Sequence, residues 1–376
     1  MSEKISSDGV LFAEENARRF KLGLITLDSP DNLNAVSLGM FHSIGKKLLQ
    51  WREREDIACV VMHATSDKAF CAGGDIKSLA MELSTDPSTT FGQEFFTAEY
   101  FVDYLIHVYP KPVLCWADGI TMGGGIGIMN GASHRVVTER TVMAMPEVAI
   151  GFFPDVGATY FLNRLPRGLG LFLGLTAARF DGSEAVATGM ADALLPAGKK
   201  HSCLEGLLRL DWTGESQKDG DILRRYLASQ KESHPSREVR ILQYLDEIAE
   251  LVDRHTIEEA DGALRGWNGR EGWIQDCLKG YFAGSPTSVK VTFEQFKRGK
   301  DLSLQEAFLR EWDMAMNFCA HSDVCEGVRA LLIEKDRCPR WNPPTLGEVK
   351  TEAVERYFSE SSVRPHLLER KIAELR

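Results

Sequence analysis

The order in which strand-like and helix-like patterns follow each other most constrains the fold of this chain. Over the first ~200 residues, short β-branched and apolar runs alternate with segments whose apolar residues recur at helical spacing. From Leu204 onward few β-branched runs occur, and helical patterns follow one another. Alternating strands and helices are typical of an α/β fold. We therefore predict an α/β region over residues 1–205 and an all-helical region over residues 206–376.

Local patterns place the individual elements of the α/β region. Two apolar runs flank the charged sequence EENARR and predict a β-hairpin. Ser37 has the character of a helix N-cap, and apolar side chains follow it at near-helical spacing as far as Trp51. A polar loop around Asp86 and Pro87 precedes a second helix, which passes through Tyr100. The expected strands cover residues 10–13, 22–27, 59–63, 113–117 and 135–139.

The helical region contains a specific start signal. The sequence from Ser303 to Glu306 matches a capping box, in which the two side chains bind each other's backbone N–H groups. We expect a further helix over 325–335. After the capping box, one helical face carries the apolar residues Leu304, Phe308, Trp312 and Met316.

Composition and charge narrow the class of protein. The formal net charge of −10, without a basic stripe, argues against nucleic acid as a partner. No run approaches the ~18 apolar residues of a membrane helix, and the charged start of the chain does not resemble a signal peptide. The eight cysteines are scattered without a C-x-x-C pair or a histidine cluster. We therefore expect neither a metal site nor disulfides, and we predict a reducing compartment, the cytoplasm.

A glycine-rich segment, GITMGGGIGIMNG at 119–131, lies between an expected strand and a helix. Its spacing does not fit a dinucleotide fingerprint, because the third glycine of G-x-G-x-x-G falls on Ile128 or Asn130. No Lys-Ser or Lys-Thr pair follows, so it is no phosphate-binding P-loop either. Two interpretations remain open. The glycines allow a strand and a helix to pack closely, or they leave N–H groups at the helix start free to bind an oxyanion.

A second glycine-containing turn, AFCAGGDI at 69–76, follows the expected strand 59–63. Taken alone, it is an ordinary connection between a strand and a helix. If it faced the first glycine-rich segment, the N–H of Gly74 would supply a second donor. Two convergent donors are what a thioester oxygen needs as it acquires negative charge.

Two carboxylates interrupt the apolar stretch MPEVAIGFFPDVG at 145–157. They are Glu147 and Asp155, and no Lys or Arg lies near them in sequence. Burial in apolar surroundings raises the pKa of a carboxyl group, which makes such groups candidates for acid–base or nucleophilic chemistry. Asp155 also fits a turn, because it follows Pro154 and precedes Gly157. Glu147 has no comparable structural explanation.

Two further polar residues have structural explanations. Glu99 lies in the helical sequence FFTAEYFVDYL, where we expect it on the solvated side, with contact to a polar substrate group as the alternative. His134 begins an expected strand, and we expect a structural histidine whose hydrogen bonds are satisfied.

Together, four segments in this order resemble the crotonase (enoyl-CoA hydratase/isomerase) superfamily. They are LNAVSLGM at 33–40, AFCAGGDI at 69–76, GITMGGGIG at 119–127 and MPEVAIGFFPDVG at 145–157. The sequence EGVRALLIEKDRCPRW at 326–341 resembles the C-terminal segment of that family. The resemblance implies a ββα spiral core that binds acyl-CoA thioesters and stabilises an enolate or oxyanion with two backbone N–H groups.

The chain departs from the hydratase pattern at two positions. Gly127 stands where hydratases of this family carry one catalytic Glu, and Asp155 stands where they carry a Gly; Glu147 matches their second Glu. This pattern, together with FFTAEY around Glu99, resembles the 3-hydroxyisobutyryl-CoA hydrolase branch. That branch implies hydrolysis of 3-hydroxyisobutyryl-CoA in valine catabolism. The sequence does not separate this substrate from 3-hydroxypropionyl-CoA, because one methyl group is worth only ~1–3 kcal/mol of discrimination.

The resemblance also implies roles for individual residues. The N–H groups of Gly74 and Gly124 would bind the oxyanion. Glu147 would attack the thioester carbonyl or deprotonate a water, with Asp155 orienting it and protonating the leaving thiolate. Substrate binding would involve Glu99 at the 3-hydroxyl group and the backbone near Ala35, Ala72 and Ile76 at coenzyme A.

Several expectations concern partners and rival functions. We expect no metal and no cofactor beyond the CoA of the substrate, no membrane partner, and leave a homo-oligomer open. The nearest rival is enoyl-CoA hydratase or isomerase activity in the same superfamily. A non-catalytic acyl-CoA-binding or RNA-binding homologue and a Rossmann dehydrogenase are more distant rivals.

Overall fold

The computed structural model describes residues 5–231, 239–269, 272–320, 323–363 and 366–375. The chain forms two compact units, each assembled from three chain segments. The first, here called the sheet unit, comprises Met1–Gly74, Phe101–Met143 and Phe180–Arg240. The second, the helical unit, comprises Asp75–Tyr100, Ala144–Arg179 and Ile241–Arg376.

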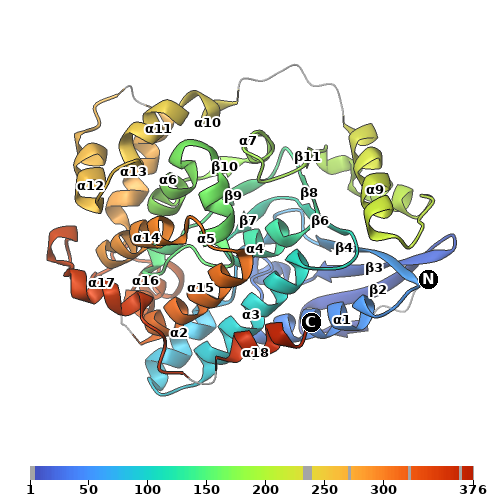
Figure 1. Ribbon diagram of the computed structural model, residues 1–376, viewed down its shortest axis with the longest axis horizontal. Helices are drawn as coiled ribbons and strands as arrows, with labels where there is room; N and C mark the ends of the chain where they lie inside the picture. Colours follow the sequence, from blue (N-terminus) through green and yellow to red (C-terminus); the bar gives the residue numbers. More distant parts are fainter. Residues whose placement is uncertain (1–4, 232–238, 270–271, 321–322, 364–365, 376) are drawn as a thin grey trace. The chain divides into compact units, whose positions relative to one another are not determined.

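A seven-stranded sheet forms the centre of the sheet unit (Figure 1), with the strand order β1-β2-β3-β4-β6-β8-β11. The first three strands pair antiparallel, and the pairs from β3 to β11 are parallel. The strands are β1 (Ile5–Ser7), β2 (Val10–Ala17), β3 (Phe20–Leu27), β4 (Ile57–Ala64), β6 (Val113–Ala117), β8 (His134–Val137) and β11 (Ala193–Leu194).

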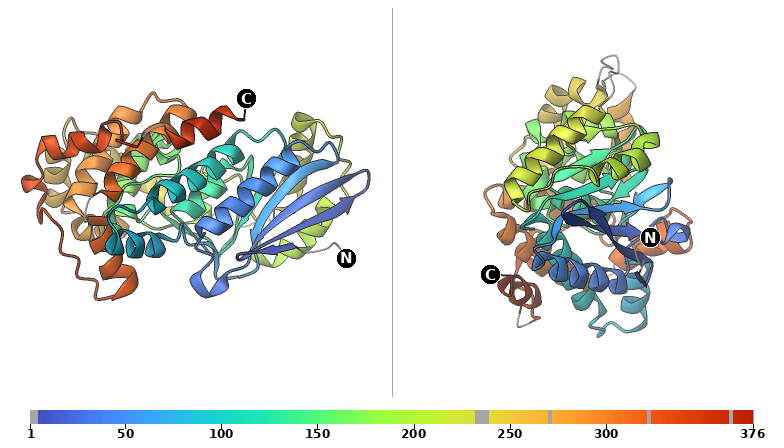
Figure 2. Two further views of the ribbon diagram at one scale, coloured as in Figure 1. Left: turned by 90° about the horizontal axis from the view of Figure 1, so that it is seen from below. Right: turned by 90° about the vertical axis from the view of Figure 1, so that its right-hand side faces the viewer.

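Helices cover both faces of this sheet, which explains why β4 and β6 are almost continuously apolar. On one face, Trp116 of β6 packs in a core with Leu207 and Leu223. Helix α1 (Leu38–Arg52) runs beside β2 and β3 (Figure 2). A Cβ atom at Gly23 would lie 2.6 Å from the ring of Trp51, so α1 approaches β3 closely only because position 23 is glycine. The other helices of the unit are α4 (Gly124–Gly131), α7 (Gly182–Ala187), α8 (Lys200–Leu207) and α9 (Ser216–Gln230).

A smaller four-stranded sheet has the order β10-β9-β7-β5. Its strands β5 and β7 are parallel, and each leads into one of the two glycine-containing segments. The strands are β5 (Ala69–Cys71), β7 (Ile120–Met122), β9 (Val142–Ala144) and β10 (Phe180–Asp181). Parallel neighbours end at the same edge of a sheet, so this pairing brings the two segments to one edge.

Apart from Ala144, the last residue of β9, the described residues of the helical unit lie in helices and connections. Helix α3 (Phe91–His107) begins in this unit and ends in the sheet unit. The earlier helices are α2 (Ile76–Thr85), η2 (Glu147–Ile150), α5 (Ala158–Phe161), η3 (Leu162–Arg164), η4 (Pro166–Gly168) and α6 (Leu169–Thr176). The later ones are α10 (Arg240–Gln243), α11 (Leu245–Val252), α12 (Ile257–Gly266), α13 (Trp273–Ala283), α14 (Pro286–Gly299), α15 (Leu304–Cys319), α16 (Asp323–Val328), a π-helical turn (Arg329–Ile333), η7 (Leu346–Glu348), α17 (Thr351–Phe358) and α18 (Leu367–Ala373).

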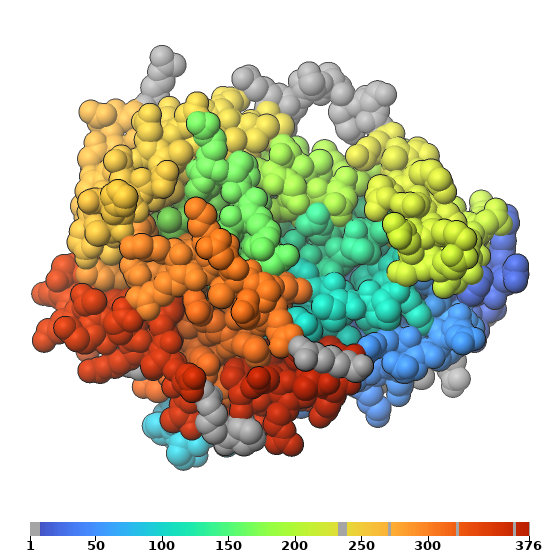
Figure 3. Space-filling model, in the orientation of Figure 1, coloured from blue at the N-terminus to red at the C-terminus, as the bar shows by residue number. Residues whose placement is uncertain are grey.

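Helices α14 and α15 are central to the helical unit. Both contact α5 and α17, and α14 also contacts α6 and η2. Their outer faces remain at the surface, where they form the orange area of Figure 3. Along the inner face of α15, Phe308 and Trp312 are fully buried, as the helical spacing predicted. The capping box at Ser303 and Glu306 is also confirmed.

The remaining predictions about elements can be compared with the structure directly. The hairpin is confirmed, but its strands extend through most of EENARR, so only the turn at Arg18 and Arg19 is left between them. The strand expected at 135–139 lies at His134–Val137. The helix expected at 325–335 begins at Asp323 and widens into a π-helical turn after Val328.

The division into compact units differs from the single boundary predicted between residues 205 and 206. The described residues beyond 205 are helical as expected, yet 206–231 and 239–240 belong to the sheet unit. Segments 75–100 and 144–179, from the predicted α/β region, belong to the helical unit. The sequence pattern indicates secondary structure, whereas the division into compact units depends on which segments pack together. The predicted boundary at 205/206 therefore marks a change of secondary structure and not the border of a unit.

Candidate active site

Glu147 begins the short 3₁₀ helix η2 and is buried, with 5% of its surface exposed. Pro146 precedes it, and the turn closes when the N–H of Phe152 donates to the Glu147 carbonyl oxygen at 3.0 Å. The side-chain atom Oε2 is buried and has no hydrogen-bond partner among the described residues. Burial, and then the charge of Asp155, raise the pKa of Glu147 well above its usual value. With a raised pKa, the Glu147 carboxyl group holds its proton more tightly, and once ionised it is a stronger base than an exposed carboxylate.

Asp155 lies in a tight turn that leads into α5 and is also 5% exposed. The turn requires left-handed backbone at Val156 (φ 55°) and Gly157 (φ 88°). The Tyr100 hydroxyl donates to Oδ2 of Asp155 at 2.6 Å. Burial raises the pKa of Asp155 to about 7, although the bond from Tyr100 lowers it. Asp155 can therefore gain or lose a proton near neutral pH, and it also fills the turn role that the sequence suggested.

A third buried carboxylate, Glu311 of α15, binds the backbone of the same turn. Its Oε2 accepts from the N–H of Gly157 at 2.6 Å, and its Oε1 accepts from the N–H of Thr159 at 2.8 Å. Its exposed fraction is 0%. Burial raises the pKa of Glu311 to about 8 against the opposing effect of these hydrogen bonds. Gln295 of α14 completes the support by donating through Nε2 to the carbonyl oxygen of Pro154 at 2.6 Å.

Within the sheet unit, the two glycine-containing segments lie together. A Cβ atom at Gly73 would lie 3.8 Å from the backbone nitrogen of Gly124. A Cβ atom at Gly125 would lie only 2.3 Å from the carbonyl oxygen of Cys71, so this contact requires glycine. Gly124 is the first residue of α4, and its N–H therefore has no acceptor inside the helix. Both interpretations of the glycine-rich sequence, close packing and an accessible amide, are compatible with this geometry.

The residues expected at coenzyme A divide between the two units. Ala35 and Ala72 are half-buried and lie in neighbouring loops of the sheet unit. The N–H of Ala72 donates to the Leu33 carbonyl at 3.0 Å, and the N–H of Val36 donates to the Gly73 carbonyl at 2.9 Å. Ala35, Ala72, Gly74 and Gly124 thus belong to one set of adjoining loops. Ile76 is the first residue of α2 in the helical unit.

The structure contradicts the prediction for Glu99 and agrees with the prediction for His134. The expectation that Glu99 faces solvent is wrong, because only 2% of its surface is exposed. Its neighbours on α3 are large buried aromatic side chains, among them Phe95 and Tyr100, which leave no solvated side at this point of the helix. His134 is a buried structural histidine as expected. Its ring nitrogens lie 3.0 Å from the Gly220 carbonyl oxygen and 3.0 Å from the Ser133 hydroxyl.

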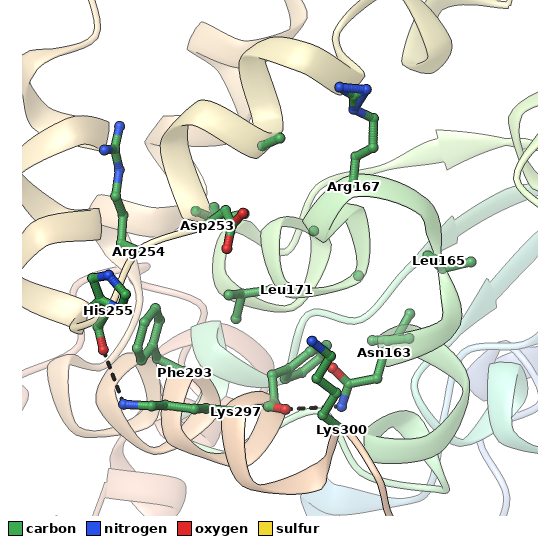
Figure 4. Close-up of a pocket in the computed structure, with 16 residues that line it drawn as sticks. Asn163, Leu165, Arg167, Leu171, Asp253, Arg254, His255, Phe293, Lys297 and Lys300 are labelled. Carbon is green, nitrogen blue, oxygen red and sulfur yellow. Dashed lines mark hydrogen bonds between the residues drawn. The ribbon is translucent and has the colours of Figure 1, made fainter.

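A separate cavity of about 500 Å³ lies elsewhere in the helical unit (Figure 4). Neither Glu147 nor Asp155 lines it. Its lining mixes apolar side chains such as Leu171 and Phe293 with Asp253 and several cations. One of these, Lys297, already donates to the His255 carbonyl oxygen at 3.1 Å. The cavity lacks a pair of acids comparable with Glu147 and Asp155.

Two classes of site are not found among the residues that the structure describes. No group of three or more His, Cys, Asp or Glu side chains is arranged to hold a metal ion. None of the described helices combines the length and the apolar character that crossing a bilayer requires.

The fold and these motifs agree with the comparison of the sequence to known families. The model of the enoyl-CoA hydratase/isomerase family matches residues 22–358, and the chain belongs to this family. Two curated relatives carry a more specific name. "3-Hydroxyisobutyryl-CoA hydrolase, mitochondrial" of Danio rerio is 37% identical over 96% of this chain and 91% of its own length. "3-Hydroxyisobutyryl-CoA hydrolase 1" of Arabidopsis thaliana is 33% identical over 95% and 93%.

Solved structures extend the likeness to three dimensions. An enoyl-CoA hydratase from Rhodobacter sphaeroides is 32% identical, covers 94% of this chain and 98% of its own, and has a TM-score of 0.82. A carnitinyl-CoA dehydratase from Mycobacterium thermoresistibile is 31% identical over 96% and 98%, with a TM-score of 0.84. The predicted crotonase-like fold with a C-terminal helical region is therefore confirmed, as is the predicted family.

Sequence reasoning missed three residues that surround Asp155. Tyr100 was expected only as an apolar helix position, and Gln295 was not singled out. Glu311 had one detectable signal: the positions three and four residues before and after it on the helix are apolar, namely Ala307, Phe308, Met314 and Ala315. A lone acid at the edge of an apolar helix face is a reason to look for a buried polar contact.

Proposed function

We propose that this chain hydrolyses 3-hydroxyisobutyryl-CoA to the free hydroxy acid and CoA. The chain is then an acyl-CoA thioester hydrolase within its family. The observation that supports this most is the buried pair Glu147 and Asp155 in a family whose hydratases use a different acid pattern. Gly127 cannot supply the second acid of a hydratase, whereas Asp155 is buried near enough for its charge to raise the pKa of Glu147. The names of the relatives from Danio rerio and Arabidopsis thaliana agree with this choice.

The proposed mechanism begins with polarisation of the thioester carbonyl. The N–H groups of Gly74 and Gly124 donate to the carbonyl oxygen and stabilise its negative charge as the carbonyl carbon becomes tetrahedral. Removing one such donor typically costs roughly 3–4 kcal/mol of transition-state stabilisation. The proximity of the two glycine-containing loops within the sheet unit supports this role.

The acids then complete the reaction by one of two routes. In the first, the Glu147 carboxylate attacks the carbonyl carbon, the C–S bond breaks, and water hydrolyses the resulting mixed anhydride. In the second, Glu147 removes a proton from a water, which attacks directly. In both, Asp155 gives a proton to the leaving CoA thiolate, and its pKa of about 7 suits that transfer. Glu99 would bind the 3-hydroxyl group, and the backbone near Ala35, Ala72 and Ile76 would bind CoA.

Replacing Glu147 by glutamine tests the proposal. We expect Glu147→Gln to abolish thiol release from 3-hydroxyisobutyryl-CoA, because an amide can neither attack nor accept a proton, while CoA-ester binding persists. Thiol release is followed with a thiol-reactive dye, and binding by calorimetry. Full activity of the variant would refute the proposal. Repeated turnover in heavy-oxygen water then separates the two routes, since only the anhydride route places label in the Glu147 carboxylate.

Enoyl-CoA hydration or isomerisation is the second candidate, favoured by the similarity to the enoyl-CoA hydratase from Rhodobacter sphaeroides. The two activities differ in what they release. A hydrolase liberates a free thiol, whereas a hydratase removes enoyl absorbance without liberating one. A panel of CoA esters measured both ways decides between them, and it also separates 3-hydroxyisobutyryl-CoA from 3-hydroxypropionyl-CoA.

Two finer proposals accompany this function. The first is that the reaction needs no metal or cofactor besides the substrate's CoA, because main-chain amides polarise the carbonyl. Activity after dialysis against a chelator tests this.

The second is that the enzyme acts in valine catabolism in the cytoplasm. The Danio rerio relative is named mitochondrial, so cell fractionation must locate the enzyme. All eight cysteines are free, which suits a reducing compartment. Whether copies assemble into a homo-oligomer is measured by light scattering.

A further inference from the structure

The segment that carries both acids is tied to helix α14 at two points. The N–H of Ser285, the N-cap of α14, donates to the Val148 carbonyl oxygen at 2.9 Å, next to Glu147. Nearly three turns later on the same helix, Gln295 donates to the Pro154 carbonyl oxygen at 2.6 Å, next to Asp155. The same Nε2 atom lies 2.8 Å from the Thr159 hydroxyl. Both ends of the segment are therefore fixed by α14.

Helix α15 fixes the turn from another direction. The two oxygens of Glu311 accept from the N–H groups of Gly157 and Thr159, one on each side of Ala158. Gly157 also packs against α15, because a Cβ atom there would lie 2.9 Å from the ring of Phe308. Asp155 thus lies in a turn whose carbonyl and amide groups are bound by buried side chains.

A carboxylate is a costly group to bury for the sake of a four-residue helix. Burial raises the pKa of Glu311, so the folded protein loses stability when this group is ionised. Nearby charges do not offset that cost. Arg298 of α14 binds Glu294 and Glu355, Arg310 of α15 donates to the Arg298 carbonyl, and Asp313 accepts from Ser361. The titratable groups that interact with Glu311 are Asp155 and Tyr100, which also titrate as acids. This cost is explained if the geometry of the turn matters for function.

We propose that Glu311 and Gln295 are positioning residues for thioester hydrolysis, which act by fixing the 154–159 turn so that Asp155 stays against Tyr100 and within electrostatic reach of Glu147. This inference rests on the proposed function. Neither side chain needs to touch the substrate. One planar carboxyl group accepts from two N–H groups of the turn at once, so Glu311 fixes the orientation of both peptide units.

Positioning through Asp155 has a kinetic signature. Displacement of a catalytic group by about 1 Å costs on the order of 100-fold in rate. We expect Glu311→Gln, which keeps the shape but can accept only one of the two N–H bonds, to lower kcat about 10- to 100-fold with KM within about threefold. In an Asp155→Asn background the same substitution should change kcat less than about twofold, because the group through which it acts is absent.

The matched control is Glu184→Gln in the sheet unit. Glu184 is also a buried glutamate, 1% exposed, and its Oε2 accepts from the N–H of Asp181 at the start of α7. Unlike Glu311, it is also paired with a cation, Arg240, which donates to both of its oxygens. It belongs to the sheet unit, whereas the 154–159 turn belongs to the helical unit. Glu184→Gln should lower the melting temperature, because it removes the ion pair with Arg240, but leave kcat unchanged. Gln295→Met, which removes the donor while keeping the side-chain length, provides a second variant if Glu311→Gln fails to fold.

The outcomes separate the inference from the proposed function. If the unmodified enzyme releases no thiol from any 3-hydroxyacyl-CoA, the proposed function fails. If it does release thiol, but Glu311→Gln and Gln295→Met keep the kcat of Glu184→Gln, the inference fails alone. It fails equally if Glu311→Gln lowers kcat as much in the Asp155→Asn background as in the unmodified enzyme, measured by single turnover with enzyme in excess. A kcat loss that disappears in that background supports it.

Discussion

Burial sets the acid–base behaviour of the single residues that matter most in this chain. Burial raises the pKa of Asp155 to about 7. Burial, and then the charge of Asp155, raise the pKa of Glu147 well above its usual value. The sequence already pointed to both, because an acid with no nearby cation in an apolar run is either paired at a distance or kept protonated. The sequence did not indicate the hydrogen bond from the Tyr100 hydroxyl to Asp155, because the two residues are 55 positions apart in the chain.

The raised pKa of Asp155 predicts that this residue weakens the fold at neutral and higher pH. The unfolded chain loses the proton near pH 3.8, whereas the folded chain keeps it until about pH 7. Between these values the folded state binds more protons, so its stability falls as pH rises. We expect Asp155→Asn, which can still accept from Tyr100, to stabilise the protein by up to roughly 4 kcal/mol at pH 8 and by little at pH 4.

Thermal melting of both proteins at pH 4 and pH 8 checks this prediction. The quantity of interest is the difference between the variant and the unmodified protein, since other groups titrate in both and cancel. An equal difference at the two pH values would mean that the Asp155 carboxyl does not titrate as described.

At the scale of elements, the sequence predicted where two helices begin, but it did not predict which elements contact each other. The N-cap at Ser37 and the capping box at Ser303 were confirmed, because both depend on residues within one turn of each other. The contact of α4 with the loop after β5 depends on residues about 50 positions apart, and the sequence left it as one of two interpretations. A Cβ atom at position 125 would lie 2.3 Å from the Cys71 carbonyl oxygen, so close packing explains the glycine there.

Gly125→Ala tests that explanation. The added methyl group would collide with a backbone carbonyl that cannot rotate away, so we expect the free energy of unfolding to fall by about 1–3 kcal/mol. Gly262→Ala in α12 is the matched control, because a Cβ atom there meets nothing within 4 Å. That substitution should stabilise the protein by up to about 1 kcal/mol through helix propensity. Denaturant unfolding measures both, and similar values for the two variants would contradict the packing argument.

At the scale of the whole molecule, each compact unit draws on distant parts of the sequence. The core of the sheet unit needs Leu207, Trp212 and Leu223 as well as strands from the first 140 residues. The segment that carries Glu147 and Asp155 packs on α14 and α15, far beyond residue 205. A change in secondary-structure pattern along the chain does not reveal this interleaving.

A fragment of residues 1–205 should therefore not fold as an independent domain. It would lose the core residues Leu207, Trp212 and Leu223 that cover one face of the sheet, and it would leave residues 144–179 without their helical partners. We expect no cooperative thermal transition by circular dichroism and rapid cleavage by protease, with the full chain as reference. A fragment that melts cooperatively and resists protease would restore the predicted boundary at 205/206.

The sequence by itself determined the α/β class, the family, the positions of several helices and strands, and the candidates Glu147, Asp155, Gly74 and Gly124. These follow from local rules: side-chain periodicity, capping within one turn, and ordered motifs. Only the tertiary structure decided that Glu99 is buried, that Glu311 and Gln295 hold the Asp155 turn, and how the compact units divide the chain. Such facts depend on contacts between residues up to about 150 positions apart, and no local pattern encodes which distant surfaces meet.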